Sequence, residues 1–196
     1  MSVVVVGSYY RPDSLHSHVV DVLTAECGAT GSEVERVILS DLDLNLLALG
    51  GQQPRGAGRE GEAARRIADA VHRCQRAKLM CVVTPVYNAG YSGATKLFLD
   101  AIPAGTLDAT VLPVGTVGTE LHGLALAYSL VPVLQALGAP HVLRPVSVSP
   151  HDWHTTADGS RRLGPETVSR LRRRLGPPPV PPETGAPEFR QEVLPA

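Results

Sequence analysis

The sequence predicts an α/β fold, in which a doubly wound, five-stranded parallel sheet of order 2-1-3-4-5 carries helices on both faces. Short β-branched runs alternate with segments of helical periodicity, which favours parallel strands joined by right-handed crossovers. A chain of 196 residues suffices for one domain with a full hydrophobic core. Two loops that each follow a predicted strand hold four of the five tyrosines, at the edge where such a sheet binds its ligand.

The first half of the chain predicts three strands and two helices. A β-branched run over 2–6 ends at Gly7, as in a strand covered on both faces. The segment 41–61 is rich in Leu, Gly and Gln and is interpreted as a long, partly ordered loop, acting as a flap or an oligomer contact. The other elements expected here are a helix over 14–27, a strand over 33–39, a helix over 62–76 and a strand over 79–83.

The second half completes the flavodoxin-like order. The elements expected here are a short helix over 94–101, a strand over 111–114, one long apolar helix over 120–137, a strand over 142–148 and a last helix over 165–175. Residues 1–175 are therefore predicted to form the domain. The proline-rich tail, 176–196, is predicted to be extended or disordered, with docking on a neighbour or partner as the alternative.

The composition argues against several classes of protein. With 43% hydrophobic residues, 19% charged residues and a formal net charge of -1, a dedicated nucleic-acid or acidic-membrane binder is not expected. No apolar stretch approaches the roughly 20 residues that span a bilayer, and the chain is expected to begin with a strand rather than a signal peptide. Three scattered cysteines favour free thiols in a reducing, cytoplasmic location.

The loop after the first strand suits a phosphate. Ser8, Arg11, Ser14 and Ser17 lie before or within the first turn of a helix, where unpaired N–H groups and a partial positive charge favour an anion. Hydroxyls and one guanidinium could complete the cage. The alternative is that Ser14 only caps the helix while Arg11 is solvated.

The loop after the third strand suits a flat heterocycle, best an isoalloxazine. Backbone amides around Val86, Tyr87 and Asn88, together with the Asn88 side chain, could hydrogen-bond its pyrimidine edge. Pro85 and neighbouring small residues let the backbone come close, and a tyrosine could cover part of the ring face. The alternative is a tight turn whose tyrosines cover the edge of the core.

A third loop, after the fourth strand, could close on the far side of the ring with Thr116, Gly118 and Thr119. His122 follows one turn into the next helix, where a lone histidine is more often structural than catalytic. Residues 151–154 contain two histidines and an aspartate, but no further ligands at convincing spacing, so no metal site is expected.

These loops resemble those of a known family. Residues 84–96 resemble the TPVY-x-x-x-YSG-x-x-K stretch of NAD(P)H-dependent FMN reductases, closest to the subgroup of two-component alkanesulfonate monooxygenase systems. Residues 116–122, with 127–128 and 131–134, are similar to that subgroup's third flavin loop and long fourth helix. The first loop resembles the family's G-S-x-R-x-x-S phosphate motif, with one additional residue before Arg11.

The resemblance implies an enzyme that transfers hydride from NADPH (or NADH) to FMN and supplies reduced FMN to a separate flavin-dependent monooxygenase, as a homodimer or homotetramer. It places the phosphate on the first loop and the ring at Pro85–Asn88, Ser92 and Thr116–Thr119. Hydride transfer needs overlap of two flat rings and no protein acid or nucleophile, so no catalytic residue is expected. It also implies that Tyr128 lies on a helix bulge at a tetramer interface, an ordinary interface aromatic being the alternative.

Other functions stay open. A flavoprotein with tightly bound FMN could instead reduce quinones, azo compounds or metal ions. An electron carrier or interaction module is a further alternative, against which the charge of -1 argues, because such carriers are usually strongly acidic. Preference for NADPH over NADH would need a cation for the 2′-phosphate, and the arginines of 52–66 are only candidates.

Overall fold

The computed structural model describes residues 1–9, 11–49, 59–157 and 159–176. Tyr10, the middle of the predicted 41–61 loop and the tail after Gly176 therefore lie outside the described residues, and the predictions made for them stay predictions.

One parallel sheet forms the centre of the molecule, in the order β2-β1-β3-β5-β6, with β7 also beside β5. Since β5 is the fourth strand of the expected pattern and β6 with β7 the fifth, the predicted order 2-1-3-4-5 is confirmed. β-Branched and other apolar residues fill the interior strands, and all but the last residue of β3 are buried. The strands are β1 (Ser2–Gly7), β2 (Glu33–Ile38), β3 (Leu79–Tyr87), β5 (Thr110–Thr116), β6 (His141–Val142) and β7 (Val146–Val148).

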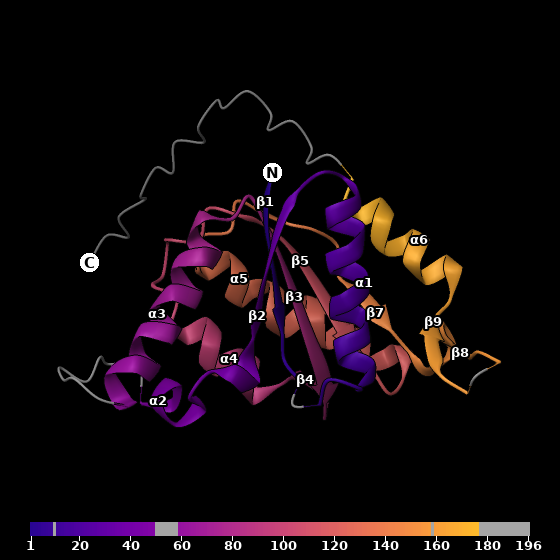
Figure 1. Ribbon diagram of the computed structural model, residues 1–196, viewed down its shortest axis with the longest axis horizontal. Helices are drawn as coiled ribbons and strands as arrows, with labels where there is room; N and C mark the ends of the chain where they lie inside the picture. The colour runs from indigo at the N-terminus through magenta and orange to yellow at the C-terminus, as the bar shows by residue number, and fades with distance from the viewer. Residues whose placement is uncertain (10, 50–58, 158, 177–196) are drawn as a thin grey trace, which may run out of the picture.

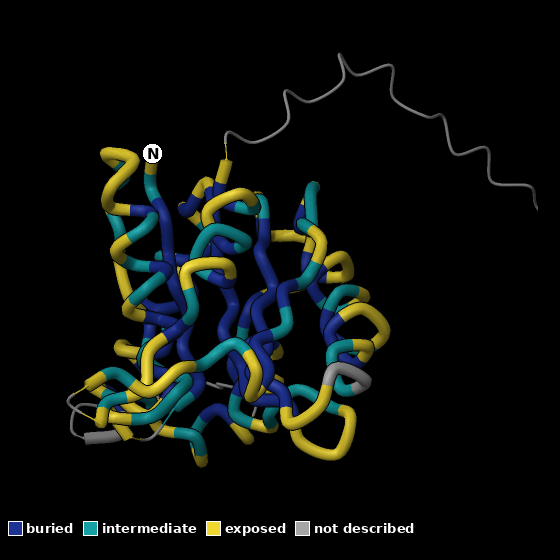
Figure 2. The backbone as a smooth tube through the Cα atoms, turned by 90° about the vertical axis from the view of Figure 1, so that its right-hand side faces the viewer, coloured by how far each residue is buried: buried dark blue, intermediate teal, exposed yellow. Residues whose placement is uncertain are grey.

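Helices cover both faces of this sheet (Figure 1). On one face lie α1 (Leu15–Ala29) and α6 (Pro165–Arg174), and on the other α3 (Arg59–Arg76), α4 (Gly93–Asp100) and α5 (Val131–Ala136). Figure 2 shows the strands as buried tubes between helices whose outer turns are exposed. The core accordingly divides into two clusters of buried residues, one on each side of the sheet.

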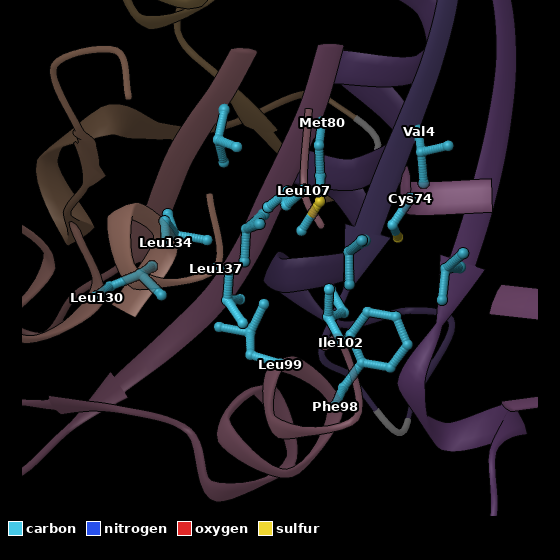
Figure 3. Packing of buried hydrophobic residues seen from close by; sticks show 14 of the residues in the cluster. Val4, Cys74, Met80, Phe98, Leu99, Ile102, Leu107, Leu130, Leu134 and Leu137 are labelled. Atoms are coloured by element: carbon cyan, nitrogen blue, oxygen red, sulfur yellow. The ribbon is translucent and has the colours of Figure 1, made fainter. Parts of the chain in front are cut away.

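The larger cluster holds α3, α4 and α5 against the sheet. Figure 3 shows Phe98 and Leu99 of α4 and Leu134 of α5 directed toward the same interior as Met80 of β3. Each of these side chains is fully buried. Burying one such side chain contributes about 1.5–3 kcal/mol to the stability of the fold. Packing on this face therefore holds the helices that follow β3 and β5 against the sheet.

The predicted helix over 120–137 is confirmed in part, because the segment is helical over 120–136 but not regularly α-helical. The segment forms a 3₁₀ turn (Glu120–Gly123), a π-helical turn (Leu126–Leu130) and then α5. Pro132 has no N–H to donate back to Tyr128, and the Ser129 hydroxyl donates to the Ala125 carbonyl, so regular α-helical bonding is interrupted here. The bulge expected around Tyr128 is confirmed by this π-helical turn, and Tyr128 is 79% exposed.

Two further segments differ from expectation. Asp43 caps a short helix, α2 (Leu44–Ala48), inside the predicted loop by accepting 3.0 Å bonds from the Asn45 and Leu46 amides. The fifth strand is split, because Pro113 in β5 and Pro145 in the facing segment each lack a ladder donor where the pairing stops.

A two-stranded sheet of β8 (Trp153–Thr155) and β9 (Arg161–Leu163) was not predicted at all. It follows a short 3₁₀ turn (Pro150–Asp152) and lies beside α1, which β9 contacts (Figure 1). None of the described helices is both long enough and apolar enough to serve as a transmembrane span.

Candidate functional site

A tight hairpin projects from the carboxyl end of β3. Val86 pairs with Tyr91 and Tyr87 with Gly90 across β3 and β4 (Gly90–Tyr91), which leaves Asn88 and Ala89 as a two-residue turn. Both have left-handed backbone, with φ of 48° and 58°, as a type I′ hairpin turn requires. Non-glycine residues held in this region store strain, a feature that clusters at functional sites.

Four hydroxyls connect this hairpin to the first loop. Ser92 Oγ lies 2.8 Å from Ser8 Oγ, 2.9 Å from Thr95 Oγ1 and 3.3 Å from Thr84 Oγ1. Thr84 Oγ1 also accepts from the Ser92 amide at 3.1 Å. Ser92 caps α4 by accepting from the Thr95 amide at 3.2 Å. The ends of β1 and β3 and the start of α4 are thereby held in fixed positions.

A cleft of about 710 Å³ opens at this edge of the sheet, a volume typical of small-molecule sites. Its walls come from the first turn of α1, the β3–β4 turn, the loop after β5, and the segment from β7 to β9. The lining residues are Leu15, His16, Pro85, Val86, Tyr87, Asn88, Thr116, Val117, Gly118, His122, Val148, Ser149, Pro150, Trp153 and Arg161.

Two histidines in this lining face different surroundings. His16 Nδ1 hydrogen-bonds Thr116 Oγ1 across the sheet edge, and burial lowers the pKa of the imidazole. His122 Nδ1 is buried with no hydrogen-bond partner among the described residues. An unpaired buried ring nitrogen is costly, so it is available to a bound polar group.

The structure brings six of the predicted site residues into the cleft and leaves the other six outside its lining. Inside are Pro85, Val86, Tyr87, Asn88, Thr116 and Gly118. Tyr87 is 63% exposed and so stands at the mouth of the cleft. Thr119 is exposed outside the lining, and Ser8 and Ser92 lie in the hydroxyl network.

The first loop is arranged differently from the expected cage. Ser14 caps α1 by accepting from the Ser17 amide at 3.1 Å. The Ser17 hydroxyl donates to the Pro12 and Ser14 carbonyls at 2.5 and 2.7 Å. The Arg11 side chain is 78% exposed and pairs with Asp13 at 3.2 Å. This geometry matches the alternative given for Ser14 and Arg11.

Sequence reasoning assigned seven of the lining residues to no site, namely Leu15, His16, Val148, Ser149, Pro150, Trp153 and Arg161. Within residues 151–154, Asp152 caps a turn and binds Arg170 at 2.8 Å. Although burial opposes ionisation of Asp152, hydrogen bonds from Thr167 and Ser149 and the Arg170 charge lower its pKa. In the described ranges, no group of three or more potential metal-binding His, Cys, Asp or Glu side chains occurs.

Comparison with known proteins agrees with this architecture. The family described as NADPH-dependent FMN reductase matches residues 1–154. An FMN reductase (NADPH) of Pseudomonas aeruginosa is 33% identical over 144 residues, covering 70% of this chain and 72% of that protein. One of Escherichia coli K12 is 49% identical over 73 residues, which is 37% of this chain and 38% of that protein. The chain thus matches little more than a third of the length of the latter.

Among solved structures, the apo form of an NADH:FMN oxidoreductase, EMOB, superposes with a TM-score of 0.71 and 26% identity. The match covers 89% of this chain and 86% of that one. An oxidoreductase of Corynebacterium diphtheriae, at TM-score 0.69 and 22% identity, shares the fold.

Proposed function

The chain belongs to the NADPH-dependent FMN reductase family, and on that premise we propose that it transfers hydride from NADPH to FMN. The observation that carries the proposal is the cleft at the carboxyl ends of β3 and β5, which the β3–β4 turn and the loop after β5 line from two sides. A doubly wound sheet binds its ligand at this edge.

The residues present fit a flavin. The wall at Pro85, Val86 and Val117 is apolar, as a flat ring requires, and the adjoining turn offers backbone groups to a pyrimidine edge. His122 Nδ1, buried without a partner in the described chain, is a polar group that such an edge could satisfy. The ring is therefore assigned to Pro85–Asn88 and Thr116–Thr119, with Ser92 supporting the turn from behind.

The phosphate is assigned to the first loop and the start of α1. Ser8, Ser14 and Ser17 fix the backbone there through their hydroxyls, and the first turn of the helix offers N–H groups and a partial positive charge to an anion. Arg11 would have to leave Asp13 to reach it, because it is exposed and paired as described above.

Bound FMN supplies the electron acceptor, and no protein acid or nucleophile is required. The chain's own residues bind and orient the two flat rings and exclude water from between them. The strained Asn88–Ala89 turn sets one side of this slot, and the Thr116–His16 hydrogen bond holds the other side against α1.

The finer parts of the proposal concern the fate of the product. Reduced FMN is released to a separate flavin-dependent monooxygenase, as in the alkanesulfonate subgroup that the loops resemble. Exposed Leu124 and Tyr128 around the π-helical turn support a homo-oligomer that buries them, because exposed large apolar side chains in one region favour an interface. Three free, buried cysteines fit a reducing cytosol.

Steady-state oxidation of NADPH with FMN, FAD and riboflavin tests the proposal. We expect colourless protein that oxidises NADPH only when flavin is added, with FMN preferred. Protein that is yellow with stoichiometric flavin and reduces quinones would replace it with the bound-cofactor function. Failure to oxidise NADPH or NADH in the presence of FMN would reject both.

A further inference from the structure

We propose that Arg161, on the β8–β9 hairpin, binds the phosphate of FMN and so makes the cleft select FMN over riboflavin. The inference rests on the proposed function and assigns to it a substrate-selecting residue. Its location was unexpected, since the sequence pointed to Arg11 for this role.

The charge distribution in the cleft leads to Arg161. Among the residues that line the described cleft, Arg161 is the single side chain with a permanent charge. Nearby arginines of the same face are engaged, Arg170 with Asp152 at 2.8 Å and Arg172 with Glu26 at 2.6 Å. Arg161 has no carboxylate partner within the described ranges. An anion entering the cleft therefore meets one guanidinium that no carboxylate of the described residues neutralises.

The hairpin register determines where this guanidinium lies. Trp153 pairs with Leu163, and Thr155 with Arg161, so these four side chains share one face of the hairpin. The Arg161 guanidinium lies 5.9 Å from the centroid of the Trp153 ring, within cation–π range. This contact places the guanidinium beside the Trp153 ring, in the part of the cleft wall that both side chains line.

The same ring fixes the hairpin to the start of α1. Trp153 lies 5.7 Å from the His18 ring, centroid to centroid, and Leu15 and His16 of the first helical turn line the cleft with Arg161. A phosphate at this wall would meet helix N–H groups on one side and a guanidinium on the other. Arginine is suited to this because its planar donors match phosphate oxygens.

The hairpin also lies at the boundary of the family match. That match ends at residue 154, after Trp153 but before β9. Arg161 thus lies beyond the residues that the family matches.

Flavin binding measured by fluorescence quenching on the full chain tests the proposal without turnover. Arg161→Ala should weaken FMN binding about 10- to 100-fold, while riboflavin binding changes less than about threefold, since it lacks the phosphate. Arg162→Ala is the matched control: it removes the same charge from the next residue, whose side chain lies on the opposite face and does not line the cleft. We expect it to bind both flavins as the unmodified protein does.

Several outcomes would overturn the proposal. These are unchanged FMN affinity in Arg161→Ala, equal losses for FMN and riboflavin, an equal loss in Arg162→Ala, or a loss in Arg11→Ala with none in Arg161→Ala. A changed preference between NADPH and NADH with FMN affinity intact would assign Arg161 to the coenzyme instead. Failure of this proposal can be distinguished from failure of the proposed function. The proposal is tested by flavin binding to the variants, whereas the proposed function fails only if unmodified protein does not oxidise NADPH with FMN.

Discussion

Removing the Ser92 hydroxyl gives a direct test of the network that holds the first loop against the β3–β4 hairpin. Ser92 Oγ caps α4 and is 2.8 Å from the Ser8 hydroxyl, which is only 5% exposed. Ser92→Ala therefore removes a helix cap and leaves a buried hydroxyl without its partner. Thr84 keeps its bonds to the Thr95 hydroxyl and the Ser92 amide, so the damage stays local.

The expected loss of stability is the sum of these two effects. Losing a serine cap costs about 1 kcal/mol, and stranding a buried hydroxyl costs about 1–3 kcal/mol, which gives about 2–4 kcal/mol in all. Ser14→Ala is the matched control, because Ser14 caps α1 through one 3.1 Å bond to the Ser17 amide. It should cost about 1 kcal/mol.

The free energy of unfolding, measured by urea titration of the flavin-free protein, decides between these values. Ser8→Ala combined with Ser92→Ala should be more stable than the sum of the single changes predicts, by about 1–2 kcal/mol, because the double variant leaves no stranded partner. If the two single effects add to within about 0.5 kcal/mol, the hydroxyls do not act as a unit. A Ser92→Ala loss no larger than that of Ser14→Ala would likewise refute the reasoning.

Three other predictions follow from the same structure. Burial lowers the pKa of His16, so its contribution to stability is complete above the ordinary imidazole pKa of about 6.5 and is lost as pH falls from there through the lowered value. His16→Gln should make unfolding free energies fall less steeply on acidification, and an unchanged slope would contradict this. Gly138→Ala should destabilise by about 2 kcal/mol or more, because φ is +104° and the added Cβ would lie 2.9 Å from the Gly105 backbone. Gly28→Ala in α1, where nothing lies within 4 Å of the added Cβ, should instead stabilise the protein by about 0.5–1 kcal/mol. Urea titrations that give similar changes for the two glycine variants would reject the steric argument. Burial raises the pKa of Cys74 to about 12, so a thiol reagent should modify it only after unfolding, and rapid labelling of native protein would show otherwise.

The sheet order could be predicted because its determinants are local. β-Branched runs predicted the interior strands, and helical spacing predicted the helices that cover them, since each buried face leaves its own period in the sequence. The break in the helix after β5 had a local signal too, because Pro132 cannot donate to the turn before it. Leu126 of the π-helical turn packs over Gly115, where an added Cβ would come within 2.8 Å of that leucine. Such packing leaves no pattern in the sequence.

Some residues of the candidate site could be predicted from the sequence and others could not. The β3–β4 turn and the loop after β5 follow strands directly, so their residues could be assigned to the sheet edge in advance. His16 could not, because its partner Thr116 lies 100 residues away. The pairing of Arg11 could have been anticipated, since Asp13 is two residues on and forms an ion pair with it at the surface. Arg161 offered no such signal, because its position depends on the pairing of β8 with β9 and on Trp153.

The position of charge in the cleft bears on how flavin leaves. The proposed release of reduced FMN requires flavin to be bound firmly enough for hydride transfer but weakly enough to leave. An exposed arginine stacked on an aromatic ring contributes less to FMN affinity than a buried cage of cations, because water competes for its hydrogen bonds.

Replacing Thr155, which pairs with Arg161 across the hairpin, by an aspartate would neutralise the charge of Arg161 without altering the apolar wall for the ring. We expect Thr155→Asp to raise the FMN dissociation constant and leave riboflavin binding unchanged, as stopped-flow fluorescence would measure. A slower FMN release in that variant would contradict the role given to this charge.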